Sequence, residues 1–172
     1  MIKLVVPTIE MKEEALAYRQ EHFDSGESVI NGSELFDKTD SYEQWLGKVT
    51  ANANPATVDP NWVLTDTFFA VEEETGEIVG IIDLRHTLKG FLADFGHSGY
   101  SVRPSRRRKG IATEMLRQLI GIAKQAGLTE LQLSVKRGNI PSVKTIEKNG
   151  GRYVRSFEYD GEKADVYKIN LL

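Results

Sequence analysis

The sequence predicts an α/β protein of the α+β type, in which a mixed, mostly antiparallel sheet of about six to seven strands is flanked by helices. Two pairs of β-rich segments surround the turn dipeptides Thr75-Gly76 and Asp160-Gly161, which indicates two hairpins. Between them, a strand pattern, an amphipathic helix pattern and a second strand pattern follow in order, which indicates one central βαβ unit. The 172 residues fall within the usual range of one domain, so we expect residues 1–172 to share one core.

The N-terminal third begins with a predicted strand over residues 2–6, closed by Pro7, and a predicted helix over residues 8–23. Residues 24–60 contain several glycines and prolines and show one helical stretch, 42–49, which follows Ser41 as N-cap. A segment of this length without strong periodicity is typically a functional cover or lid.

The elements after residue 60 have clearer patterns. The most regular is a helix with apolar residues at helical spacing, which ends at Gly127. The predicted ranges are, in order, 67–71 and 78–84 for the first hairpin, 99–102 for the next strand after a glycine-containing loop, 111–126 for the helix, 131–135 for a strand, 141–148 for a short helix, and 153–159 and 164–171 for the closing hairpin.

Composition limits the classes of function. The net charge is −3 and the isoelectric point about 5.7, which argues against a general nucleic-acid binder. No apolar run approaches the roughly 20 residues that cross a bilayer, so we expect no membrane association. The segment Met1 to Pro7 is too short and too soon interrupted for a signal peptide, which makes a cytoplasmic location our expectation.

The same composition argues against thiol and metal chemistry. The chain has no cysteine, so neither a disulfide nor a thiolate nucleophile is available. Its three histidines, His22, His86 and His97, lack the spacing of a zinc motif. We therefore expect no metal site.

One short segment is strongly basic although the whole chain is acidic. Five cationic side chains lie within seven positions, directly before Gly110 and the predicted helix; they are Arg103, Arg106, Arg107, Arg108 and Lys109. A basic loop that leads through glycine into a helix N-terminus offers free backbone N–H groups, the positive end of the helix dipole and guanidinium donors together. This pattern favours a phosphate site, and the alternative is a solvated basic loop.

The segment also carries a motif. Arg107-x-x-Gly110-x-Ala112 resembles the acyl-CoA signature of the GNAT superfamily of N-acetyltransferases, and Asn139-x-x-Ser142 resembles the second recurring element of that superfamily. The similar block covers residues 99–151. The resemblance implies a GNAT-like sheet whose central βαβ unit binds acyl-CoA, with acetyl-CoA as acyl donor and a primary amine as acceptor.

The resemblance also implies which residues bind acetyl-CoA. Backbone amides from Arg108 to Thr113 would face the pyrophosphate, the strand before the loop would pair with the pantetheine arm, and Asn139, supported by Ser142, would contact the pantetheine or the thioester end. The predicted set is Tyr100, Ser101, Val102, Arg107, Arg108, Lys109, Gly110, Ile111, Ala112, Thr113, Asn139 and Ser142. Small residues at positions 110 and 112 would let the backbone approach the phosphates closely.

Acetyl transfer to an amine needs a proton acceptor, because amines are mostly protonated at neutral pH. His97, just before the predicted CoA strand, is the first candidate base, with His86 second and Asp94 nearby. The thiolate is often protonated in this superfamily by a tyrosine at the position of Ile146, so Tyr100, Tyr153 or solvent would have to serve here.

We therefore interpret the chain as an acetyl-CoA-dependent N-acetyltransferase acting on a small-molecule or peptide amine. The alternative is a non-catalytic CoA-binding or regulatory domain, favoured by Ile146 and by the lack of a clear carboxylate base. Nucleic-acid binding through the basic segment is the third hypothesis. A homodimer is compatible with this interpretation, and the sequence leaves the acceptor unidentified.

Overall fold

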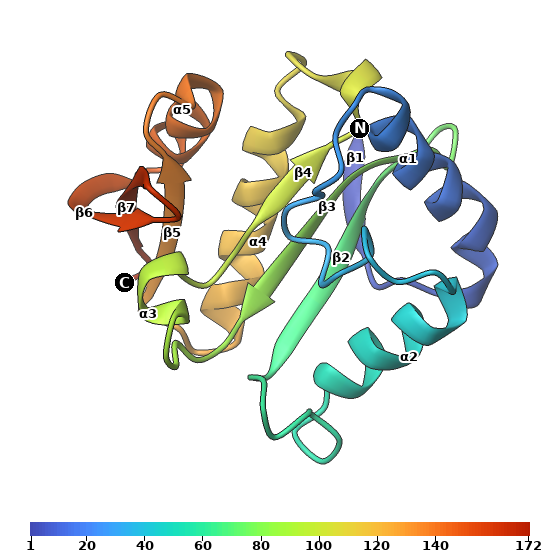
Figure 1. Ribbon diagram of the computed structural model, residues 1–172, viewed down its shortest axis with the longest axis horizontal. Helices are drawn as coiled ribbons and strands as arrows, with labels where there is room; N and C mark the ends of the chain where they lie inside the picture. Colours follow the sequence, from blue (N-terminus) through green and yellow to red (C-terminus); the bar gives the residue numbers. More distant parts are fainter.

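The computed structural model describes all residues, 1–172, and contains seven strands in two sheets (Figure 1). The elements are β1 (Ile2–Val5), η1 (Ile9–Met11), α1 (Lys12–Asp24), α2 (Tyr42–Asn52), β2 (Thr65–Glu72), β3 (Ile78–Arg85), α3 (Leu92–Phe95), β4 (Tyr100–Val102), η2 (Pro104–Arg106), α4 (Ile111–Gln125), β5 (Glu130–Lys136), α5 (Ile140–Lys148), β6 (Arg152–Tyr159) and β7 (Glu162–Asn170). The predicted fold class is confirmed.

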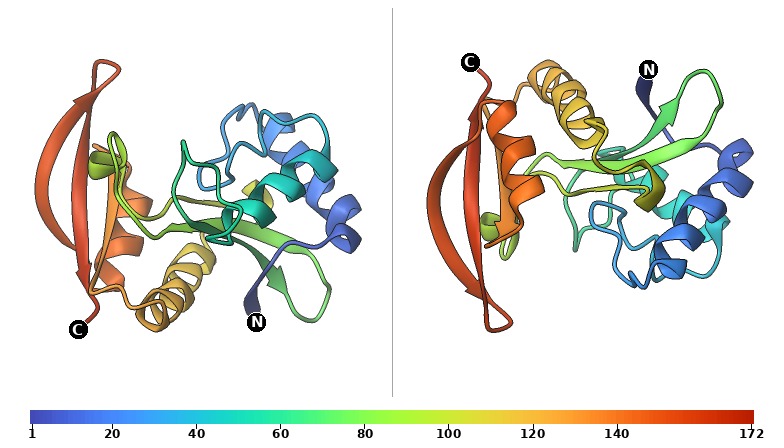
Figure 2. Two further views of the ribbon diagram at one scale, coloured as in Figure 1. Left: turned by 90° about the horizontal axis from the view of Figure 1, so that it is seen from below. Right: turned by 90° about the horizontal axis from the view of Figure 1, so that it is seen from above.

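The sheets have the strand orders β1-β2-β3-β4 and β5-β7-β6, and all their ladders are antiparallel. The two strands of the predicted βαβ unit, β4 and β5, therefore belong to different sheets. Figure 2 shows α1 and α2 on one face of the four-stranded sheet and α4 on its other face. None of the helices has both the length and the apolar character needed to cross a membrane.

Two apolar clusters hold these layers together. The larger one joins α4 and α5 to both sheets and includes Met115, Leu133 and Ile146. The smaller one packs α1 and α2 against the opposite face of β2 and β3, and Trp45 is fully buried in it. Because α4 contributes to the core of both sheets, burial of its apolar stripe fixes the position of its N-terminus relative to β4 and β5.

Most element boundaries agree with the sequence patterns. Ser41 caps α2 by accepting a hydrogen bond from the Gln44 backbone N–H, and Gly127 follows α4 with φ of +89°. Two details differ. The predicted helix over 8–23 begins with a separate 3-10 turn, and the loop before β4 contains the short helix α3, which is too short for a periodicity signal.

Candidate active site

The segment that leads into β4 approaches β5 where the two sheets meet. The contact is an isolated bridge between Gly96 and Leu133, supported by a 2.7 Å hydrogen bond from the His97 N–H to the Gln132 carbonyl. Gly96 has φ of +90°, and a Cβ atom there would lie 2.3 Å from the Gln132 carbonyl oxygen, so only glycine permits this approach. Beyond the bridge the strands continue in separate sheets, which leaves one edge of β4 without a partner strand.

The unpaired edge of β4 presents backbone groups. Gly99 and Arg103 bond to β3, because the Gly99 carbonyl accepts from the Asp83 N–H and the Arg103 N–H donates to Val79. Alternation in an antiparallel ladder then directs the backbone groups of Tyr100 and Val102 to the opposite edge. The backbone of Ser101 faces β3, so two of the three predicted strand residues present their backbone groups toward β5.

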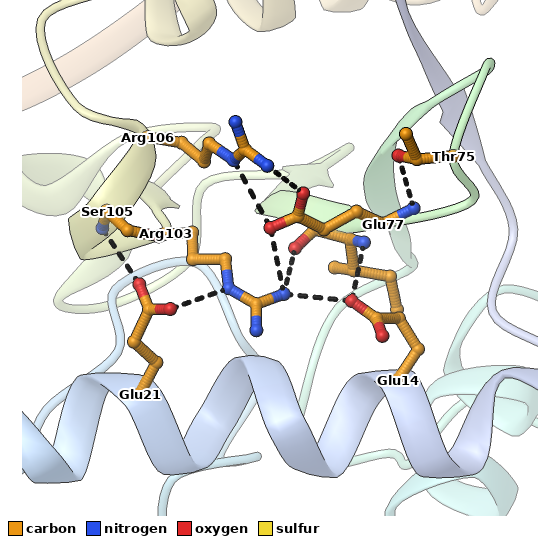
Figure 3. A network of polar contacts seen from close by, with 8 residues as sticks. Glu14, Glu21, Thr75, Glu77, Arg103, Ser105 and Arg106 are labelled. Carbon is orange, nitrogen blue, oxygen red and sulfur yellow. Dashed lines mark hydrogen bonds and ion pairs between the residues drawn. The ribbon is translucent and has the colours of Figure 1, made fainter.

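The first half of the basic segment is held by carboxylates (Figure 3). Arg103 is mostly buried, and its guanidinium donates to Glu14 at 2.8 Å and to Glu21 at 3.0 Å, both on α1, and to the Ile78 carbonyl at 3.0 Å. Glu77 lies 3.5 Å from the same guanidinium. The hydrogen bonds and neighbouring charges of Glu21 and Glu14 raise the pKa of Arg103 against the opposing effect of burial, so it stays charged.

Two further arginines are also engaged. Arg106 donates to both carboxylate oxygens of Glu77. Arg107 makes two hydrogen bonds to Glu27, of 2.6 and 2.7 Å, and donates to the Val102 carbonyl at 3.1 Å. The predicted role of Arg107 in binding acetyl-CoA stays a prediction, and in the structure its guanidinium fixes the loop onto residues 25–41.

The second half of the segment is free. Neither Arg108 nor Lys109 has a polar partner, and both are exposed. No backbone N–H from Arg108 through Thr113 donates a hydrogen bond within the protein, although these six groups are consecutive. Gly110 has φ of +77° and its Cβ position is open space, so the loop turns sharply into α4 without an obstruction. We name these six residues, 108–113, the amide loop.

The amide loop combines two sources of positive potential. Three of its N–H groups belong to the first turn of the 15-residue helix α4, where the helix dipole adds positive charge, and two of its side chains are unpaired cations. Such an arrangement binds phosphate oxygens.

The second predicted element lies across the gap from β4. Asn139 is the N-cap of α5, and its side-chain oxygen accepts from the Ser142 N–H at 3.4 Å. The Tyr100 hydroxyl faces Ser142 and Thr145 but has no hydrogen-bond partner, and burial raises its pKa. Ile146 is fully buried in the larger core.

His97 occupies a structural position. Its side chain is 8% exposed, and its Nδ1 accepts a 2.8 Å hydrogen bond from the Gln132 backbone N–H. Burial lowers the pKa of His97 to about 4. An imidazole whose Nδ1 accepts a hydrogen bond carries its proton on Nε2, so no lone pair remains for a substrate proton. This geometry argues against the base role that the sequence predicts.

The other two candidate bases also have partners. His86 Nε2 lies 2.7 Å from the Asp66 carboxylate, and Asp94 forms an ion pair with Arg155. Of the three, none combines an unpaired acceptor atom with a position on the unpaired edge of β4.

The structure instead contains a carboxyl cluster that the sequence reasoning missed, made of Glu34, Asp83 and Arg85. Asp83 is fully buried on β3 and accepts from the Gly99 N–H at 2.7 Å and from Arg85 at 3.2 Å. Glu34 lies beside Asp83, and its Oε1 accepts from the Trp62 indole at 2.9 Å. Burial and the Asp83 carboxylate raise the pKa of Glu34 to about 8. The available signal was an aspartate inside the apolar run of β3.

Comparison with known proteins places this geometry in a family. Residues 19–152 match the model of the acetyltransferase (GNAT) domain, a range that contains the amide loop, the gap and the carboxyl cluster. Among curated proteins, no sequence matches the chain significantly.

Solved structures of the same fold resemble the whole chain. An N-acetyltransferase from Staphylococcus aureus Mu50 has 17% identity and a TM-score of 0.69, covering 100% of this chain and 99% of that one. RimJ from Mycobacterium smegmatis, in complex with CoA-disulfide, has 20% identity and a TM-score of 0.71 over 98% and 81%. The yncA structure from Salmonella typhimurium with its cofactor acetyl-CoA has 15% identity and a TM-score of 0.66 over 99% and 94%. At these identities the likeness shows the fold.

Proposed function

The chain belongs to the GNAT acetyltransferase family, and on that premise we propose that it transfers the acetyl group of acetyl-CoA directly to a primary amine. The observation that carries this proposal is the amide loop, in which six consecutive backbone N–H groups and two unpaired cationic side chains lie at the start of α4. The pyrophosphate of acetyl-CoA would accept from these groups. The similar yncA structure holds acetyl-CoA, which supports the same donor for this chain.

The gap between β4 and β5 would hold the pantetheine arm. The backbone groups of Tyr100 and the N–H of Val102 on the free edge of β4 can pair with the amides of the arm as they would with an added strand, whereas the Val102 carbonyl already accepts from Arg107. Asn139 and Ser142 lie across this gap at the start of α5. The arm would therefore run from the amide loop toward the bridge at Gly96, where the acetyl group would meet the amine.

The proposed reaction is a direct transfer. The amine nitrogen forms a C–N bond to the acetyl carbonyl carbon, the C–S bond breaks, and the electron pair leaves with sulfur. A covalent enzyme intermediate on cysteine is excluded, because the chain has none.

Tyr100 is suited to donate a proton to the leaving thiolate. Its hydroxyl is buried without a partner beside Ser142 and Thr145, and its raised pKa keeps the phenol protonated. Tyr153, the other tyrosine considered from sequence, is 55% exposed and its hydroxyl lies 2.6 Å from the Ser156 hydroxyl. We therefore assign this role to Tyr100 in place of the residue at position 146.

His97 as general base remains the prediction of the sequence, and one variant decides it. His97→Ala removes the hydrogen bond from the Gln132 N–H to His97 Nδ1 and keeps the backbone bond beside it, so from the structure we expect a stability loss of about 1–3 kcal/mol and turnover within a few-fold of wild type. A turnover loss of ~10²-fold, with a flattened acidic limb of the pH profile and intact CoA affinity, would instead establish His97 as the base.

The function itself is tested by two measurements. Release of CoA thiol from acetyl-CoA in the presence of a panel of small amines and peptide N-termini should be detectable and should be lost in Gly110→Val. In a thermal melt, CoA at 100 times its dissociation constant should stabilise the protein by ~2.7 kcal/mol. Stabilisation by CoA without turnover on any amine would favour the non-catalytic CoA-binding domain, and a melting curve unchanged by millimolar CoA would contradict both.

A further inference from the structure

A row of aromatic side chains leads away from the carboxyl cluster. Neighbouring ring centroids lie 6.0 Å apart between Trp62 and Phe91, 5.9 Å between Phe91 and Phe95, and 4.9 Å between Phe95 and Tyr159. Phe91 and Tyr159 are 61% and 60% exposed. The rings come from the loop before β2, from the segment around α3 and from the end of β6, so three separate parts of the chain build one aromatic surface.

The row is joined to the carboxyl cluster by Trp62. Its indole N–H donates to Glu34 Oε1, while its ring packs on Phe91. Glu34 also lies close to Asp83 and Arg85 of β3, which bond to each other. These three residues are the titratable and charged groups of the cluster, which therefore contains two carboxyl groups and one guanidinium.

The cluster is also joined to the proposed acetyl position. Asp83 accepts from the N–H of Gly99, the residue directly before β4. Gly32, two residues before Glu34, packs directly against Gly99. A Cβ atom at Gly32 would lie 2.2 Å from the Gly99 carbonyl oxygen. An amine beside Glu34 would therefore lie near the start of the strand that faces the proposed pantetheine arm.

Building on the proposed function, we propose that Glu34 binds the ammonium group of the acceptor and accepts its proton, and that Trp62 and Phe91 hold an aromatic body attached to that amine. The acceptor class is then an arylalkylamine or the N-terminus of a peptide that begins with an aromatic residue. Both sources present a primary ammonium a few bonds from a flat apolar ring.

The proton balance of this step is closed. The bound ammonium gives one proton to the Glu34 carboxylate, which frees the nitrogen lone pair that forms the C–N bond. The nitrogen of the adduct gives a second proton to water as the C–S bond breaks, the leaving thiolate takes a proton from Tyr100 or water, and solvent returns a proton to Tyr100. Proton transfer is most efficient when the pKa of the acceptor lies near the working pH, and the raised pKa of Glu34 agrees with this requirement.

The proposal that the acceptor carries an aromatic group rests on the exposed rings of the row. Covering an exposed phenyl ring with a second apolar surface lowers the free energy of binding. A ring beside an ammonium group adds a favourable cation–π interaction. Two sets of charged groups flank the row: the carboxyl cluster at Trp62, and Asp94 beside Phe95, whose carboxylate is already paired with Arg155. A long polar acceptor would leave Phe91 uncovered, whereas an aromatic amine covers it and places its nitrogen at Glu34.

The first test replaces the proton acceptor. Glu34→Gln keeps the shape of the side chain and an oxygen for the Trp62 indole, so we expect a normal fold and CoA affinity but a turnover ~10²-fold below wild type with 2-phenylethylamine. The control is Asp40→Asn, because Asp40 is exposed in the same segment and has no polar contact. Turnover of Glu34→Gln within threefold of wild type would overturn the assignment of Glu34.

The second test separates the aromatic body from the amine. Phe91→Ala should raise the KM for 2-phenylethylamine about fivefold and leave the KM for ethanolamine unchanged. A peptide with N-terminal phenylalanine, compared with one with N-terminal serine, distinguishes a peptide from a small-molecule source. Equal KM changes for both small amines, or a wild-type preference for ethanolamine and the serine peptide, would overturn the substrate class while acetyl transfer itself persists. Absence of CoA-dependent stabilisation would instead overturn the proposed function.

Discussion

Both halves of the basic segment are positively charged in the sequence, but their surroundings in the structure differ. Arg103, Arg106 and Arg107 are neutralised by carboxylates from α1, from the loop after it and from the turn before β3. Arg108 and Lys109 have no partner, and the backbone N–H groups beside them are free. A run of positive charge in a sequence therefore does not by itself mark a ligand site, since here its first part anchors the loop and only its second part has no partner in the protein.

The largest expected effect comes from breaking the anchored half. Arg103→Ala leaves Glu14, Glu21 and Glu77 without their shared partner, and loss of one member of a mostly buried ion network costs about 3 kcal/mol. For a chain of this size the melting temperature should fall by roughly 6–12 °C. Arg117→Ala, which removes an exposed pair with Glu114, is the matched control and should stay within about 0.5 kcal/mol. Equal effects of the two variants would contradict the anchoring role.

The next effect concerns the free half. Gly110→Val places a β-branched residue at φ of +77°, which distorts the turn into α4, and we expect a loss of ~2 kcal/mol or more in CoA binding as charge-assisted hydrogen bonds disappear. Gly121→Ala, on the same helix with an open Cβ position and no positive φ, should bind CoA normally. Calorimetry on folded protein measures both. Unchanged affinity in a folded Gly110→Val variant would remove the amide loop from the donor site.

A smaller effect on CoA affinity is expected from removing one unpaired cation of the amide loop. Lys109→Ala removes an unpaired ammonium next to the proposed phosphates, and a loss of about 1 kcal/mol, or roughly fivefold in CoA affinity, is expected at low salt. The loss should shrink as salt rises, because the group is exposed. Lys48→Ala on α2 serves as control. A loss of equal size in both variants would mean that only general charge matters.

The smallest effect is a pH dependence of the anchored half. The hydrogen bond from Arg107 lowers the pKa of Glu27 from 4.5 to about 2. A carboxyl group with a lowered pKa in the folded state contributes stability above its unfolded pKa, and this contribution is lost as the pH falls from about 4.5 toward 2. Glu27→Gln should therefore lose less stability than wild type between pH 6 and pH 3 in urea titrations. Parallel pH curves for the two proteins would contradict the coupling.

The proposed donor half of the site could be predicted from the sequence because its signals are local. Glycine at position 110, the helix pattern after it and Asn139 before the next helix are all read from short windows, and the structure places these residues at helix N-termini. Short stretches of sequence could not show that Arg103, Arg106 and Arg107 have partners 29 to 89 residues away.

The proposed acceptor half could not be predicted in the same way. Glu34 appears in the sequence as one of several acids in an irregular segment, and only the tertiary contact with Asp83 and Trp62 separates it from the rest. His97 was selected for its ordinary pKa range, but burial and the Gln132 N–H change its environment.

Backbone amide NMR spectra recorded during a CoA titration test the proposed donor site most directly, because they report on each N–H group separately. We expect the largest chemical-shift changes at residues 108–113 and at the free edge of β4, Tyr100 and Val102, with smaller changes at the anchored Arg103 and Arg106. Saturable shifts confined to other parts of the molecule, with residues 108–113 unaffected, would contradict the assignment of the amide loop as the phosphate site.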